Sequence, residues 1–138
     1  MVKTEMIANK QFAEITSITA QAVRTMLGFQ LRHVGINMDS ADASMAVADE
    51  LSSLMGVPVK EGTSSIFVGT QFEVMKKKYL GAHGHLAIGT NFIDRAISHL
   101  ERKGCRIIEE SKTHKNGKLV AVYLEQEIGG FALHLLQL

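Results

Sequence analysis

The chain has 138 residues, 46% of them hydrophobic and 21% charged, which is typical of one globular domain with its own core and not of a disordered chain. The formal net charge of +1 lacks the excess of lysine and arginine that nucleic acid or an anionic membrane attracts, so we expect neither as a partner. The single cysteine, Cys105, excludes an internal disulfide, and no apolar run approaches the roughly 18 residues of a membrane span, so we expect a soluble, cytoplasmic protein.

The first half of the chain predicts a helix, a strand and a second helix. In NKQFAEITSITAQAVRTMLGF, apolar residues recur every three or four positions, which is typical of a helix with one apolar face. In QLRHVGIN the period becomes two, with Val34 and Ile36 on one side and His33 on the other, which indicates a strand with two different faces. Asp39 and Ser40 offer N-cap oxygens to a following helix, ADASMAVADELSSLMG.

Three short strands are predicted next, and the same order of elements then recurs. The strands are VPVKEG, SSIFVG and QFEVMK. HGHLAIGT then predicts a strand, NFIDRAISHLERKG a helix, and CRIIEES, LVAVYLEQ and GFALHLLQL three more strands, with KNGK at residues 115–118 as a hairpin turn. The sequence therefore predicts an α+β fold in which two βαβββ modules follow an N-terminal helix.

Two such modules suggest where the polar residues meet. One helix covers only one face of a four-stranded sheet, so two modules side by side can curl their uncovered faces into a trough. His33 and His85 occupy the same position in the first strands, while Glu73 and His134 lie in the last strands between large apolar neighbours. Three imidazoles and one carboxylate would suit zinc, nickel, iron, cobalt or manganese. Each of the four residues could instead be a hydrogen-bonded structural group.

Other polar residues give weaker indications. His99 and His114 are expected to be solvated, and His83 is expected at the rim of the trough or in solvent. The run Lys76–Lys78 predicts a solvated loop, with contact to an anionic substrate as the alternative.

The segments RHVGIN and GHLAIGT, the paired βαβββ order and Glu73 resemble the vicinal oxygen chelate superfamily, which includes glyoxalase I, epimerases and extradiol dioxygenases. The resemblance covers about residues 31–138. In that superfamily the first and fourth strands of each module supply metal ligands, which implies His33, Glu73, His85 and His134 as ligands. His134 departs from the glyoxalase pattern, where a glutamate commonly serves as ligand and base, so chelation is retained but glyoxalase-type proton transfer is not implied.

A more specific resemblance extends over the whole chain. RHVGIN, VKEGTSSIFVGT, FEVMKKKYLG, GHLAIGTN, AISHLERKG and EIGGFALHLLQ resemble the C-terminal extension of some bacterial bifunctional aldolases for 2-keto-3-deoxy-6-phosphogluconate and 4-hydroxy-2-oxoglutarate. Residues 1–30 resemble the end of the aldolase barrel, and residues 31–138 form the chelate domain, with modules at about 31–78 and 83–138. Aldol cleavage by this chain alone is not expected, because the Schiff-base lysine would be missing.

Two functions remain open from the sequence. The first is a metal-dependent lyase or isomerase in which a divalent ion binds adjacent oxygens of a small keto or hydroxy acid, with Glu73 or a metal-bound hydroxide as the candidate base. The second is a non-catalytic module that binds a small molecule, or joins subunits as a homodimer, and tunes an associated aldolase.

Overall fold

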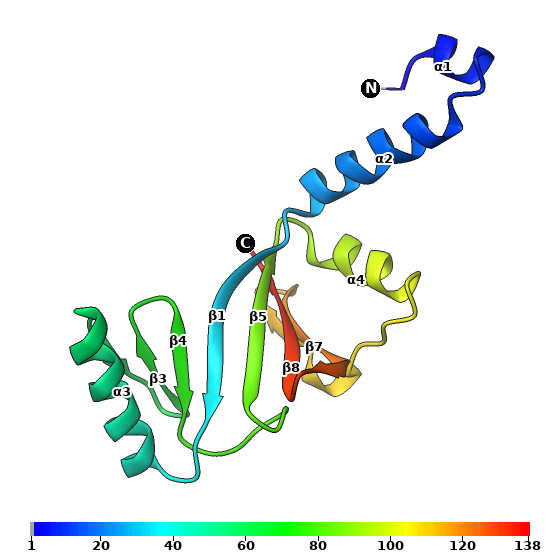
Figure 1. Ribbon diagram of the computed structural model, residues 1–138. Coiled ribbons are helices and arrows are strands. Elements are labelled where there is room, and N and C mark those ends of the chain that lie inside the picture. The colour runs from blue at the N-terminus through cyan, green and yellow to red at the C-terminus, as the bar shows by residue number, and fades with distance from the viewer. Residues whose placement is uncertain (1) are drawn as a thin grey trace.

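A computed structural model describes residues 2–138 and contains two similar modules that follow a pair of helices (Figure 1). The N-terminal helices are α1 (Thr4–Ala8) and α2 (Phe12–Leu27). The first module consists of β1 (Gln30–Asn37), α3 (Ala41–Met55), β2 (Val59–Glu61), β3 (Ser65–Val68) and β4 (Phe72–Met75). The second consists of β5 (Gly84–Thr90), α4 (Ile93–Glu101), the short 3-10 helix η1 (Glu109–Ser111), β6 (Thr113–Lys115), β7 (Lys118–Ile128) and β8 (Phe131–Gln137).

The predicted helix boundaries have clear local causes. At the start of α3, the Ser40 side chain accepts a hydrogen bond from the backbone N–H of Ala43. Gly28 and Gly56 end α2 and α3 in the left-handed conformation, with φ angles of 58° and 65°. The sequence therefore located both helices correctly, although it did not predict α1.

The strands form one mixed sheet that is symmetric about its centre. Their order is β2-β3-β4-β1-β5-β8-β7-β6, so the two first strands of the modules lie side by side. β1 and β5 pair antiparallel, and each pairs on its other side with the last strand of its own module, β4 or β8, in parallel. The predicted α+β fold of paired βαβββ modules is confirmed.

The helices cover one face of this sheet. In the first module, α3 packs on Ile66, Val68 and Val74, and in the second, α4 packs with Val122 and Leu135. Because neighbouring residues of a strand point to opposite faces, the residues between them point away from the helices. We call this opposite side the uncovered face; it carries Phe67, Glu73, His33, His85, Tyr123 and His134.

One predicted strand is wrong. CRIIEES forms only an isolated bridge from Ile107 to Leu124, followed by η1, and the edge strand β6 lies further along the chain. The apolar residues of CRIIEES are explained by Ile107, which packs against the α4 core without continuous strand pairing. The predicted hairpin is confirmed, because Lys115 pairs with Lys118 around Asn116 and Gly117, both with positive φ angles.

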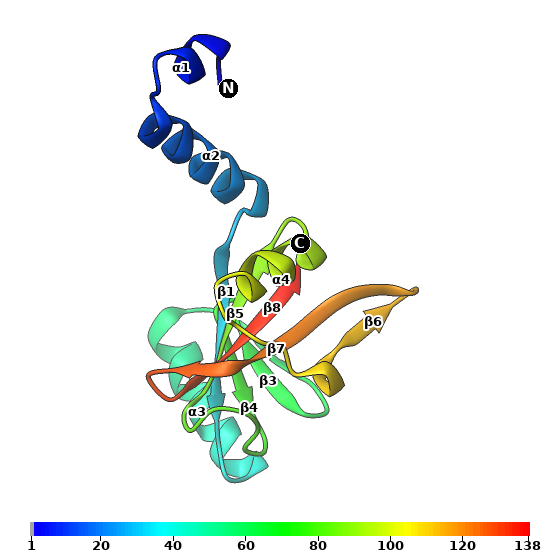
Figure 2. The ribbon, with the colours of Figure 1, turned by 90° about the vertical axis from the view of Figure 1, so that its right-hand side faces the viewer.

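The N-terminal helices project from the domain (Figures 1 and 2). Leu27, at the end of α2, is buried in the α4 core, but Phe12, at its start, is 60% exposed. None of the described helices combines the length and the hydropathy that crossing a membrane requires.

Candidate functional site

The two central strands bring His33 and His85 together. In the β1–β5 pairing, His33 is opposite Ala87 and Gly35 is opposite His85, so the two imidazoles are diagonal neighbours. Their Nε2 atoms lie 3.2 Å apart. A Cβ atom at Gly35 would lie 2.6 Å from His85 Nε2 and closer still to Nδ1 and Cε1. Glycine at this position therefore leaves the space that the His85 ring occupies.

The two outer strands of the central group add Glu73 and His134 by equivalent pairings. Glu73 of β4 is in register with Gly35, and His134 of β8 is in register with Ala87. Gly35 lies two residues after His33, and Ala87 lies two residues after His85. In each module, the polar residue of the last strand is therefore the neighbour of this small residue. The sequence repeat becomes a two-fold arrangement of four polar side chains around the centre of the sheet.

The Glu73 carboxylate joins both histidines. Its Oε2 atom lies 3.1 Å from His33 Nε2 and 3.2 Å from His85 Nε2, and its Oε1 atom accepts a hydrogen bond of 2.6 Å from the Ser65 hydroxyl. Burial by itself would raise the pKa of Glu73, but the hydrogen bonds from His33, His85 and Ser65 outweigh it and hold the pKa well below its usual range. The carboxylate is therefore ionised at neutral pH and available as an oxygen ligand.

His134 is held against Tyr123 on the other side of His85. The rings of His134 and Tyr123 stack at 4.3 Å with an angle of 4° between their planes. Burial, and then the charges that His85 and His33 can carry, lower the pKa of His134 to about 4. At neutral pH this imidazole is uncharged and keeps the free nitrogen lone pair that a metal ligand needs.

The donor set and its spacing fit a borderline divalent ion. His33, His85 and His134 each offer a ring nitrogen within 4.8 Å of the others. The His33 and His85 Nε2 atoms and Glu73 Oε2 form a tighter triangle of 3.1–3.2 Å. This is close to the separation expected between tetrahedral ligands with bonds of about 2.0–2.1 Å. The buried Nδ1 atoms of His85 and His134 have no hydrogen-bond partner among the described residues, as is typical of a site that an ion or water completes.

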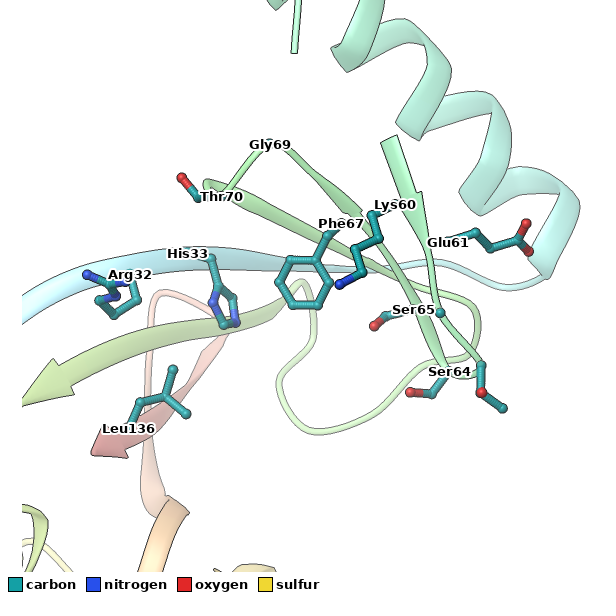
Figure 3. Close-up of a pocket in the computed structure, with 12 residues that line it drawn as sticks. Arg32, His33, Lys60, Glu61, Ser64, Ser65, Phe67, Gly69, Thr70 and Leu136 are labelled. Carbon is teal, nitrogen blue, oxygen red and sulfur yellow. The ribbon is translucent and has the colours of Figure 1, made fainter. Parts of the chain in front are cut away.

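A cavity of about 640 Å³ opens beside this cluster (Figure 3). Its lining includes Lys60 of β2, Phe67 of β3, His33 of β1 and Leu136 of β8. In a flat sheet, β2 and β8 would lie about 24 Å apart, because adjacent strands are separated by about 4.8 Å. Since both strands line one cavity, the uncovered face is concave.

The four residues singled out from the sequence therefore lie together, and two further contributors were missed. Ser65, which anchors Glu73, alternates with the buried Ile66 on β3, so its position in an apolar strand was a usable signal. Tyr123 lies in register with His134, which only the pairing of β7 with β8 reveals. Of the remaining histidines, His83 is exposed beside Phe131 and outside the cluster.

The structure resembles solved proteins of diverse activity. Methylmalonyl-CoA epimerase from Mycobacterium tuberculosis is 15% identical with a TM-score of 0.60, and the match covers 81% of this chain and 89% of that one. Homoprotocatechuate 2,3-dioxygenase from Arthrobacter globiformis is 16% identical with a TM-score of 0.53, over 78% of this chain and 35% of that one. At these identities the likeness concerns the fold alone, and no curated protein matches the sequence.

The family assignment comes from the sequence itself. The family model for the Glyoxalase/Bleomycin resistance protein/Dioxygenase superfamily matches residues 23–135, which include both modules and all four polar residues of the cluster. The chain therefore belongs to the Glyoxalase/Bleomycin resistance protein/Dioxygenase superfamily.

Proposed function

We propose that the uncovered face binds one divalent metal ion through His33, His85 and His134, with Glu73 as the oxygen ligand. The observation that carries this proposal is the triangle of 3.1–3.2 Å formed by two imidazole nitrogens and a carboxylate oxygen. Imidazole ligands favour zinc, nickel, iron, cobalt or manganese over calcium or magnesium.

We further propose that the ligand is a small keto or hydroxy acid and that the reaction is that of a metal-dependent lyase or isomerase. A bound ion would act as a Lewis acid on two adjacent oxygens of the acid and favour its enolate form. Glu73 is the candidate base because its carboxylate lies within the cluster, but a pKa held well below the usual range makes it a weak base for this step. The cavity next to His33 is large enough for a small acid.

The test is metal content, measured by mass spectrometry on protein purified without a histidine tag and dialysed against each candidate ion. We expect about one ion per chain in the parent and little in His33→Ala and His85→Ala. His114→Ala is the matched control, because it removes an exposed histidine of β6 and leaves the cluster intact. Full metal occupancy in both cluster variants, with folding verified by circular dichroism, would contradict the proposal.

A second candidate function is a non-catalytic binding or dimerisation module of an aldolase. The projecting start of α2 favours it, because Phe12 is 60% exposed and Ile7 of α1 is 57% exposed. Apolar surface of this kind is typical of a contact with another protein. We expect sedimentation experiments to show a homodimer, and we expect Phe12→Ser to weaken this dimer. A monomeric parent at micromolar concentration would contradict self-association.

A further inference from the structure

A bulge in β1 brings Arg32 onto the uncovered face. In a regular strand, Arg32 would point away from the side that carries His33. From Leu31 to His33, however, the partner on β5 advances by only one residue, from Ile88 to Ala87, so Arg32 is an extra residue in β1. Bulges of this kind redirect side chains and are frequent next to active sites.

Gly89 supplies the space for the redirected side chain. Gly89 lies two and four residues after Ala87 and His85 on β5, and so on the same face of the sheet. A Cβ atom at Gly89 would lie 2.9 Å from both Cγ and Cδ of Arg32, which shows that the arginine stem crosses directly over the glycine. Arg32 thus belongs to the lining of the cavity beside the histidines (Figure 3).

A second cation lines the same cavity. Lys60 and Arg32 flank Phe67 and His33 in Figure 3. The only acidic side chain in the lining, Glu61, is paired with Lys76 at 2.6 Å. Within the described residues, neither Arg32 nor Lys60 forms an ion pair. The cavity therefore offers two cationic groups without a counter-charge, which favours an anionic ligand.

We propose that Arg32 binds a second anionic group of the ligand, with Lys60 adding positive charge to the same cavity, so that the ligand is a dianionic keto or hydroxy acid. This inference rests on the proposed metal site, which would hold the end of the ligand with adjacent oxygens. The other end carries a carboxylate or phosphate-type group, which the planar guanidinium of Arg32 can bind through two parallel hydrogen bonds.

The test is a calorimetric titration of protein carrying its metal with three probes. 2-Oxoglutarate has the second carboxylate, 2-oxopentanoate has a methyl group in its place, and 2-oxo-4-phosphonobutanoate has a phosphonate. We expect both probes with a second anionic group to bind roughly 10- to 100-fold more tightly than 2-oxopentanoate, and Arg32→Gln to remove most of this preference. The tighter-binding of the two identifies the anionic group.

The controls separate this inference from the metal proposal. Lys115→Gln removes the same charge from the exposed β6 hairpin (Figure 2) and should leave all three affinities within about twofold. If metal content is one ion per chain, the inference is overturned by equal binding of 2-oxoglutarate and 2-oxopentanoate, or by an unchanged preference in Arg32→Gln. The metal proposal is not affected by either result. If the parent holds no metal, the metal proposal fails, and the same comparison on the metal-free protein still decides the role of Arg32.

Discussion

Replacing Gly35 with alanine should disrupt the metal site without removing any of its ligands. The new Cβ would lie 2.6 Å from His85 Nε2 and closer still to Nδ1 and Cε1, whereas unstrained contacts are about 3.5 Å or longer, so the ring would have to retreat by more than about 1 Å. His85 is only 1% exposed, and the rings of His33, Tyr123 and His134 surround it with centroids 5.3–5.8 Å away. A displaced His85 ring would therefore push against these neighbouring rings.

Gly35→Ala should lower both the stability of the protein and its affinity for the metal ion. Overpacking of this kind typically destabilises a protein by about 1–3 kcal/mol, which urea denaturation of the chelator-treated protein would measure. Displacement of a ligand ring should weaken metal binding by roughly 10- to 100-fold, the range found when groups that orient metal ligands are removed. Competition with a chromophoric chelator would measure the affinity.

Gly56→Ala is the control that distinguishes a loss of stability from a loss of metal binding. A Cβ atom at Gly56 meets nothing within 4 Å, but its φ of +65° disfavours alanine, so this variant should lose about 1 kcal/mol of stability and keep its metal affinity. If folded Gly35→Ala bound the ion as tightly as the parent, either His85 would not be a ligand or Gly35 would not position it.

Two further predictions concern the cluster, and one concerns the β6–β7 hairpin. Burial and neighbouring histidines lower the pKa of His134 to about 4, so below pH 6.5 the unfolded chain takes up a proton that the folded chain does not. The free energy of unfolding of the chelator-treated protein should therefore fall by up to about 3 kcal/mol between pH 6.5 and 4. The same pH profile in His134→Leu would contradict this. Ser65→Ala removes the hydroxyl that donates to Glu73 and should cost about 1.5–3 kcal/mol in urea denaturation at pH 7, whereas no measurable loss would mean that water replaces the hydroxyl. Gly117→Ala should destabilise the β6–β7 hairpin by about 1 kcal/mol in thermal unfolding, because Gly117 has a φ of +74°, and it should leave metal content unchanged.

Local patterns determined much of the fold. A period of two along β1 and β5 assigns His33 and His85 to the same side of their strands, and the repeated order of elements relates the two modules. The same patterns gave a wrong prediction for CRIIEES. Its apolar run indicated a strand, but the run is apolar because Ile107 packs against the α4 core. Short apolar runs do not distinguish paired strands from buried connections.

Only the tertiary structure decided how the polar residues meet. The sequence determined which face each candidate ligand occupies, because side-chain direction depends on the residue's own strand. Their separations depend on the pairing of strands far apart in the chain, which places His33 Nε2 3.2 Å from His85 Nε2 across 52 residues. The bulge that redirects Arg32 likewise exists only in the register of β1 against β5. The register of β1 against β5, which are far apart in the chain, depends on how the buried face of the whole sheet packs, so the residues of one strand alone do not give it.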